Sequence, residues 1–257
     1  LARGVKVRIL KDGTPVREVC DVFTGAPLTV ATTAAEQADC ADQRSLVREI
    51  NAAPGSSYAP FNKDNLCGGP SDHCYQHGKM VIADGRTAMI STGNFDNSNF
   101  CESSVMKDNC NRDYSVILNA PDQVATLKDI FEHDVVAQRY DLAGLLRQHG
   151  NTSLTVSPLS LDPILNLIAS AKHSIRIQNQ YLKDPKMNAA LVAKARTGVK
   201  IQVTVSSECA YGKPNATDIR NATLLFTSFE QAGIQARLFT KSNRINGHPG
   251  YMHAKAI

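Results

Sequence analysis

The chain contains an internal repeat, and this repeat limits the folds that are open to it. ARGVKVRIL at 2–10 resembles ARTGVKIQVTV at 195–205. Each copy starts at a glycine that ends a helix and continues into alternating β-branched and polar residues, which predicts a strand entering an α/β sheet. A helix (around 42–52 and 220–232), a strand and a His-x-Lys strand follow each copy. We therefore expect two structurally similar halves.

The rest of each half also alternates strands with helices. In the first half, HGKMVIADGRTAMIST holds the turn signal Asp84-Gly85 and predicts a strand pair, followed by a strand, DYSVIL, and a helix over about 121–139. In the second half, DPILNLIASAKHS and MNAALVAKARTG have apolar residues at helical spacing, and SIRIQNQYL between them is typical of a strand. This alternation predicts an α/β fold with helices on both faces of a sheet.

A polar linker near 145–157, which ends in Pro158, marks the boundary between the halves. We predict two similar α/β lobes, 1–147 and 148–257, each a mixed and mostly parallel sheet flanked by helices. The chain opens at the end of a helix and stops inside a strand, HAKAI. We therefore expect the first lobe to be truncated at its N-terminus and the second at its C-terminus.

Composition narrows the classes of function. With 257 residues, of which 42% are hydrophobic, the chain can bury a sizeable core. The formal net charge of +4 suits a phosphate-bearing substrate but falls short of the dense basic patches of a dedicated nucleic-acid binder. No run of 18 apolar residues occurs and the first residues do not form a signal peptide, so we expect the chain as given to be soluble. An upstream secretion signal stays open.

Cysteine spacing bears on the compartment. The seven cysteines are Cys20, Cys40, Cys67, Cys74, Cys101, Cys110 and Cys209. The first six fall into three sequence-local pairs in polar loops, which favours disulfides and a secreted or periplasmic protein, with Cys209 left over. Reduced thiols in a cytosolic protein are the alternative. A zinc site from Cys67, His73, Cys74 and His77 is a further option, although this spacing fits no common ligand pattern.

The strongest signal for chemistry is HGKMVIAD, which places His77, Lys79 and Asp84 as His-x-Lys-x4-Asp. In an extended strand, His77 and Lys79 point to the same face, so an imidazole and an ammonium converge on one small volume. Seven His and fourteen Lys in this length give on the order of 0.4 His-x-Lys matches by chance. One match would therefore be a weak signal, whereas two at matching positions of a repeat are a strong one.

The second match is HPGYMHAKAI, which supplies His253 and Lys255, and its expected Asp would follow the last residue. Two such motifs across an internal repeat resemble the phospholipase D superfamily. The resemblance covers essentially the whole chain. It implies that the two motifs meet at a pseudo-twofold interface, with the active site between the lobes.

Two further segments carry the resemblance. STGNFD, with Asn94, stands where the family often has Gly-Ser-x-Asn, and NRDYSVI, with Asp113, stands where relatives carry Asn-x-Glu or Arg-Asp. The chain departs from the family at Ser91, where many relatives have Gly, and at Asp113, where several have Glu. These departures leave both His-x-Lys pairs intact, but they leave the subfamily and the substrate open.

The chemistry also follows from the residue types. A phosphodiester is anionic and resists attack, so an enzyme must neutralise the nonbridging oxygens, supply a nucleophile and protonate the leaving alkoxide. Lys79 and Lys255 supply point charges, and Asn94 adds a neutral hydrogen bond. One neutral imidazole can attack phosphorus, and the other, protonated, can serve the leaving group and later activate water or an alcohol. No metal or other cofactor is needed, and no cluster of carboxylates that would hold two divalent ions is visible.

The resemblance implies His77 as the nucleophile and His253 as the acid, although the reverse assignment stays open. Asp84 and Asp113 are candidates for structural support and for holding an imidazole tautomer. The alternatives are a turn carboxylate for Asp84 and a solvated strand end for Asp113.

We therefore predict a phosphodiesterase of the phospholipase D type, which hydrolyses or exchanges the headgroup of a phospholipid through a phosphohistidine. A peripheral contact with a membrane surface suits this substrate. The alternatives are a phosphatidyltransferase like cardiolipin synthase, a metal-independent nuclease, and a catalytically silent module that binds phosphate or a partner protein. Modest charge and little interleaving of aromatic with basic residues disfavour nucleic acid as a partner. The oligomeric state stays open.

Overall fold

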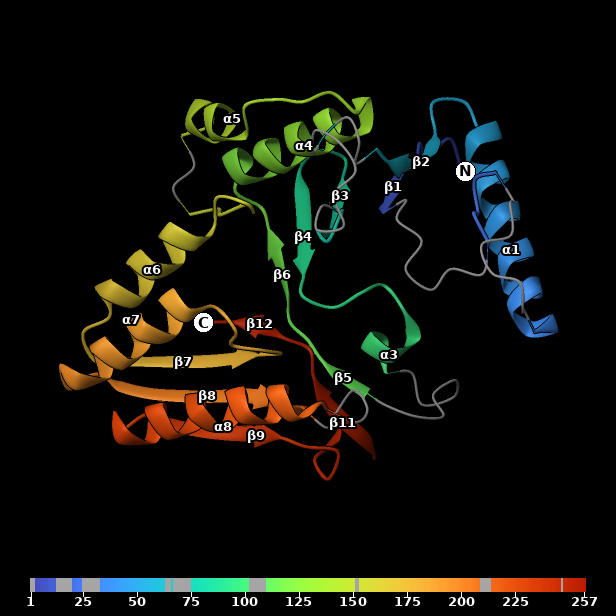
Figure 1. Ribbon diagram of the computed structural model, residues 1–257. Helices are drawn as coiled ribbons and strands as arrows, with labels where there is room; N and C mark the ends of the chain where they lie inside the picture. The colour runs from blue at the N-terminus through green and yellow to red at the C-terminus, as the bar shows by residue number, and fades with distance from the viewer. Residues whose placement is uncertain are drawn as a thin grey trace. The chain divides into compact units, whose positions relative to one another are not determined.

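The structure is a computed structural model (Figure 1) that describes residues 3–12, 20–24, 33–62, 66, 75–101, 110–150, 153–208, 214–245 and 247–257. It is a mixed α/β fold, as the sequence predicts. The chain divides into two compact units, and each combines segments from distant parts of the sequence. The first unit is Leu1–Gly78 with Pro121–Gly150, and the second is Lys79–Ala120 with Asn151–Ile257. The predicted lobe boundary at 147/148 and the pseudo-twofold relation stay predictions.

Within its described residues, the first unit has a two-stranded parallel sheet and the helices α1, α4 and α5. β1 (Arg8–Asp12) pairs with β2 (Ser57–Phe61), and α1 (Ala34–Ala52) precedes β2 along the chain. α4 (Pro121–Val136) contacts both strands, and Arg8 of β1 forms an ion pair with Glu132 of α4 at 2.6 Å. α5 (Leu142–Gln148) follows and occupies the first part of the predicted 145–157 linker, so that part of the linker prediction was wrong.

The second unit begins with a three-stranded antiparallel sheet in the order β3-β4-β6. β3 (Lys79–Ala83) and β4 (Thr87–Ser91) form the predicted strand pair, and β6 (Ser115–Leu118) lies on the other side of β4. Asp84 and Gly85 have φ values of 53° and 64°, as a two-residue hairpin turn requires. Arg86 N–H closes this turn on Ala83 O at 3.0 Å. The sequence signal for this turn is confirmed.

The main core of the second unit lies under a four-stranded sheet in the order β12-β7-β8-β9. β7 (Ser174–Asn179), β8 (Lys200–Ser206) and β9 (Gln235–Phe239) are parallel, whereas β12 (Lys255–Ala256) is antiparallel to β7. Three helices contribute to the core: α6 (Leu161–Ser170), α7 (Pro185–Arg196) and α8 (Ala216–Gln231). Figure 1 shows these helices beside the sheet.

In the described part of the second unit, one face of this sheet contributes to that core. Ile201, Val203 and Val205 of β8 alternate with polar neighbours and pack with buried residues of all three helices. The opposite face carries Gln202, which accepts a hydrogen bond from Arg176 Nε at 3.3 Å and donates one to Gln235 Oε1 at 3.0 Å. Among the described residues, helices therefore cover one face of this sheet, not both faces as the alternation of elements predicted.

A small sheet joins the middle of the sequence to its last part. β11 (His248–Met252) pairs in parallel with β5 (Cys110–Arg112) and antiparallel with β10 (Arg244–Ile245). The short helix α3 (Asn97–Phe100) contacts β5. Because Met252 pairs with Arg112, the residues that follow these two strands emerge side by side.

Two of the three expected cysteine pairs are confirmed as disulfides. Cys20 bonds to Cys40 and Cys101 bonds to Cys110, with Cα–Cα distances of 6.2 and 5.4 Å. These distances lie in the ordinary range for disulfides. Cys67, Cys74 and Cys209 lie outside the described residues.

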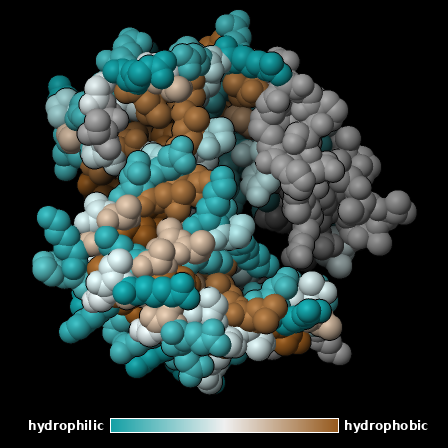
Figure 2. Space-filling model, turned by 60° about the vertical axis from the view of Figure 1, so that its left-hand side comes forward, coloured by the Kyte–Doolittle hydropathy of each residue, from teal (hydrophilic) through white to brown (hydrophobic). Residues whose placement is uncertain are grey.

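The surface mixes apolar and hydrophilic side chains. Figure 2 shows apolar areas interrupted by hydrophilic residues on one face of the molecule. The exposed apolar residues of the second unit include Leu167 of α6 and Ile219 and Leu224 of α8. Within the described parts of the chain, no helix has both the length and the apolar character needed to cross a bilayer.

Candidate active site

The parallel pairing of β5 with β11 brings His253 next to Asp113. The His253 N–H donates to Arg112 O at 3.1 Å, which extends the pairing by one residue. The His253 Nδ1 then lies 3.0 Å from Asp113 Oδ1, with side-chain exposures of 12% and 9%. A carboxylate at this distance makes Nδ1 the protonated nitrogen of a neutral imidazole and leaves Nε2 for chemistry.

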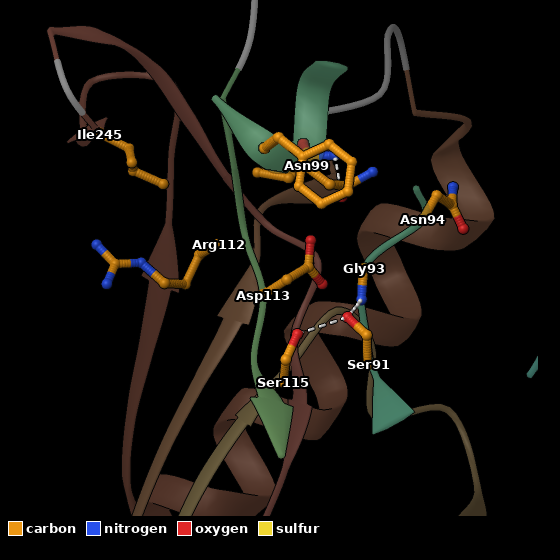
Figure 3. A pocket seen from close by; sticks show the side chains of 10 residues that line it. Ser91, Gly93, Asn94, Asn99, Arg112, Asp113, Ser115 and Ile245 are labelled. Atoms are coloured by element: carbon orange, nitrogen blue, oxygen red, sulfur yellow. Dashed lines mark hydrogen bonds between the residues drawn. The ribbon is translucent and has the colours of Figure 1, made fainter. Parts of the chain in front are cut away.

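Asp113 is held by the loop after β4. Thr92 Oγ1 donates to Asp113 Oδ1 at 2.9 Å. Thr92 Oγ1 also accepts a hydrogen bond from Tyr114 N–H at 2.9 Å. A Cβ atom on Gly93 would lie 2.8 Å from Asp113 Oδ2, so this close approach requires glycine. Figure 3 shows the Asp113 carboxylate directed toward Gly93. Oδ2 is buried and has no hydrogen-bond partner among the described residues.

Asp113 is ionised at neutral pH. Burial by itself raises the pKa of Asp113, but hydrogen bonds from His253 and Thr92 and the positive charge of Lys255 lower that pKa below its ordinary value. An ionised Asp113 stabilises a positive charge on the neighbouring imidazole, which suits a residue that takes up and releases a proton.

Lys255 completes a compact group around His253. Its Nζ lies 3.1 Å from His253 Nε2 and also donates to His253 O. Burial lowers the pKa of Lys255 to about 8, Asp113 raises it, and the charge of Lys79 lowers it. Lys79 is therefore close enough for its ammonium to act on that of Lys255, so the second unit gathers both motif lysines.

Lys79 lies at the end of the three-stranded sheet that adjoins the Thr92 loop. It is the first residue of β3 and pairs with Ser91, which in turn pairs with Ser115. Ser115 Oγ donates to Ser91 Oγ at 3.0 Å. The end of the sheet that carries these polar residues is therefore the end near Asp113.

A cavity of about 360 Å³ opens beside Asp113 within the second unit. Neutral hydroxyl and amide groups dominate its lining (Figure 3): Ser91, Asn94, Asn99, Asn111 and Ser115. Asn94 is exposed and next to Gly93, so the structure brings this predicted residue to the edge of the site. Arg112 also lines the cavity and, in Figure 3, its guanidinium points away from Asp113.

Asp84 lies away from Asp113 within the second unit, whereas His77 belongs to the first unit. Asp84 is exposed in the hairpin turn just after β3, and the strand extends about 13 Å from Lys79 to Ala83. His77 is exposed in the first unit, ahead of the start of β3. Its ring packs edge-on against that of Tyr75, with the ring centroids 5.6 Å apart. His77 and Lys79 therefore do not share one regular strand. The meeting of His77 with His253 stays a prediction.

Sequence reasoning missed the polar residues that anchor the His253 segment. Ser206 at the end of β8 donates to Met252 O at 2.8 Å and accepts from Met252 N–H at 3.0 Å. Gln180 after β7 donates its N–H to Ala254 O and its Nε2 to Tyr251 Oη, both at 2.9 Å. Both residues stand at the carboxyl end of a buried parallel strand, where open α/β sheets hold their sites, and this position was the available signal.

The described residues contain no group of three His, Cys, Asp or Glu side chains arranged to hold a metal ion. Three members of the alternative zinc set, Cys67, His73 and Cys74, lie outside the described residues.

A comparison with one solved structure agrees with the fold. The crystal structure of phosphatidylserine synthase from Haemophilus influenzae Rd KW20 is similar at a TM-score of 0.53 and 12% identity, over 98% of this chain and 70% of that one. Polyphosphate kinase from Porphyromonas gingivalis covers 79% of this chain and 29% of its own, at a TM-score of 0.41 and 13% identity. A search of curated proteins finds no significant match.

A family model described as "Cardiolipin synthase, PLD-like domain", where PLD stands for phospholipase D, matches residues 1–135 and 164–257. These ranges include both His-x-Lys pairs and Asp113. The chain thus belongs to this family of PLD-like domains, within the phospholipase D superfamily.

Proposed function

We propose that the chain is a phospholipase D-type phosphodiesterase that cleaves or exchanges the headgroup phosphodiester of a phospholipid through a phosphohistidine. The observation that carries this proposal is the Asp113–His253–Lys255 group, since an oriented imidazole beside an ammonium suits general acid–base work on a phosphate. Family membership supports the same chemistry. In this proposal His77 and Lys79, the first His-x-Lys pair, act on the same phosphate as His253 and Lys255.

The reaction has two displacements. A nitrogen of neutral His77 attacks phosphorus, the N–P bond forms, the P–O bond to the leaving alcohol breaks, and protonated His253 gives its proton to the leaving oxygen. Neutral His253 then takes a proton from water or an alcohol, whose oxygen attacks phosphorus while the N–P bond breaks. The proton and charge balance close over the two steps.

Lys255 has a separate part in this scheme. In the structure it donates to the Nε2 of His253. A bound phosphate anion is a stronger hydrogen-bond acceptor for the Lys255 ammonium than the imidazole is. When Lys255 turns to the phosphate, His253 Nε2 is free to carry the proton that goes to the leaving group. Lys79 and Asn94 add charge and a neutral hydrogen bond to the nonbridging oxygens. Asp113 keeps the His253 tautomer fixed throughout.

A second candidate is phosphatidyl transfer to an alcohol. The description of the matching family favours it, and the similar crystal structure is named as a synthase. Transfer and hydrolysis share the covalent intermediate and differ only in the acceptor of the second step. The neutral polar lining of the cavity beside Asp113 is compatible with an alcohol acceptor.

The two disulfides support a secreted or periplasmic location, because such bonds persist in oxidising compartments. The exposed apolar side chains are suited to a peripheral contact with lipid.

One experiment tests the central claim. The protein is incubated with phosphatidylcholine vesicles or with DNA, with and without glycerol, and products are separated by mass spectrometry. We expect headgroup release from the lipid, and a phosphatidylglycerol product if transfer competes with water. A quenched reaction should carry an acid-labile phosphatidyl group on His77, absent from the His77→Asn variant. Full activity of His77→Asn would refute the assignment, and cleavage of DNA alone would favour a nuclease.

A further inference from the structure

A buried carboxylate of the first unit has no part in the reaction described above. Asp134 of α4 is 9% exposed and both of its oxygens are bonded. Oδ2 accepts from Gln76 Nε2 at 3.2 Å, and Oδ1 accepts from Tyr140 Oη at 3.3 Å. Buried carboxylates are uncommon because desolvation is costly, so a retained one calls for a specific reason.

Gln76 connects this carboxylate to the residue after His77. While its Nε2 donates to Asp134, its Oε1 accepts from the Gly78 N–H at 2.6 Å. A Cβ atom on Gly78 would lie 2.9 Å from Oε1, so glycine permits this contact. Gln76 and Gly78 flank His77 in the sequence, and a single amide group therefore fixes the main chain on both sides of the imidazole.

The Gln76 side-chain amide has a defined orientation because an ionised carboxylate can only accept hydrogen bonds. An ionised Asp134 cannot donate, so it holds Nε2 of Gln76 toward α4 and thereby directs Oε1 toward Gly78. The Tyr140 hydroxyl donates to the second oxygen, and the Tyr140 ring is stacked on His133 with ring centroids 4.5 Å apart. The direction of the Asp134 carboxylate is thus set from two sides.

We propose that Asp134 is a positioning residue for His77, acting through the side chain of Gln76. The inference rests on the proposed function, because it assumes that His77 attacks phosphorus. A nucleophile must be held in a narrow range of geometries, and a misplacement near 1 Å costs about a hundredfold in rate. The Asp134–Gln76–Gly78 connection limits such movement in a segment that precedes β3 and has no strand pairing of its own.

The test exchanges donor and acceptor across this contact. Gln76→Glu keeps the acceptor for Gly78 but sets a carboxylate against Asp134, which repels it. Adding Asp134→Asn restores the bond with reversed polarity, since the new amide donates to Glu and its oxygen still accepts from Tyr140. Gln138→Glu adds the same charge at an exposed position near the end of α4 and is the matched control.

We expect Gln76→Glu to lower kcat on short-chain phosphatidylcholine by at least about tenfold, with KM within about twofold, because the nucleophile is misplaced while binding groups are unchanged. The Gln76→Glu/Asp134→Asn double variant should recover kcat to within about threefold of the parent, and Gln138→Glu should match the parent. The NMR signals of the His77 ring should shift in Gln76→Glu and return in the double variant. Melting temperatures show whether each variant is folded.

Each possible outcome supports or overturns the inference. Rescue of kcat and of the His77 signals together supports the inference. An inactive His77→Asn variant beside a fully active Gln76→Glu, or a folded double variant without rescue, overturns it and leaves the proposed function intact. An active His77→Asn variant refutes the proposed function, and the positioning role of Asp134 is refuted with it. The NMR comparison of Gln76→Glu with the double variant then shows separately whether the Gln76–Asp134 contact orients the His77 ring. If Gln76→Glu fails to fold, the double variant decides: restored folding without restored kcat overturns the inference.

Discussion

The Nδ1 atom of His253 lies 3.0 Å from the Oδ1 atom of Asp113, although the two residues are 140 positions apart in the sequence. Their side chains meet because two strands from distant parts of the chain pair in parallel and end in register. This contact fixes which imidazole nitrogen carries the proton, and the first prediction depends on it.

Asp113→Asn should reduce kcat by roughly 10²- to 10⁴-fold, because an amide can donate to Nδ1 and so favours the wrong tautomer. KM should change little. Steady-state kinetics on a chromogenic phosphodiester would measure this effect. Thr92→Val, which removes a donor to the same carboxylate without touching His253, should cost less; an equal loss in both variants would indicate general damage to the loop.

The rate should fall as the pH rises through about 8, where Lys255 loses its charge. Burial lowers the pKa of Lys255 to that value, and Lys79 contributes in the same direction. Lys255→Arg should keep its charge and move this decline to higher pH. In Lys79→Ala the pKa of Lys255 should rise, because the neighbouring positive charge that lowers it is gone. The residual activity of this variant should therefore decline at a higher pH than that of the parent. Rates measured from pH 5 to 10 would test this, and a flat profile between pH 7 and 9 would contradict it.

Asp134 should make the first unit less stable as the pH rises from about 4 to about 6. Burial raises the pKa of Asp134 from 3.8 to about 6, with smaller opposing effects from Tyr140 and His133. The folded state therefore binds the proton more tightly than the unfolded state, so the free energy of unfolding decreases across this interval as the proton is lost. The difference in melting temperature between the parent and Asp134→Asn should change in that interval and level off above it. A constant difference from pH 4 to 7 would show that the carboxyl is not perturbed.

Gly93→Ala should destabilise the site by about 1–3 kcal/mol, because the new methyl group would lie 2.8 Å from Asp113 Oδ2 and push the carboxylate away from His253. Urea denaturation and kcat should both report the loss. In an Asp113→Ser background the same substitution should cost less, since the shorter side chain relieves the clash. Additive effects of the two substitutions would exclude a direct contact.

Local patterns were enough for most of the secondary structure. The Asp84-Gly85 turn signal predicts the β3–β4 pair, and alternating residues predict β8 with its buried Ile201, Val203 and Val205. The family was also readable from two His-x-Lys pairs. α5 was missed because its seven residues run into a polar stretch that reads as a linker.

The pairing of strands could not be read in the same way. Nothing local to HPGYM or to CNR states that β11 and β5 are neighbours, because that contact depends on the packing of the whole second unit. For the same reason Asp113 was named as a tautomer holder without its partner, and Ser206 and Gln180 were missed. The position of His77 ahead of β3 also escaped a periodicity argument, since strand alternation applies only inside a strand.

The β5–β11 pairing also sets the order of events during synthesis. Asp113 leaves the ribosome long before His253, and the Asp113–His253 contact exists only once the later strand has docked beside the earlier one. A one-residue slip in that docking would turn the imidazole to the opposite face of the strand. A nascent chain that ends before β11 therefore lacks an assembled Asp113–His253 pair, and any activity that depends on this pair arises only at a late stage of folding.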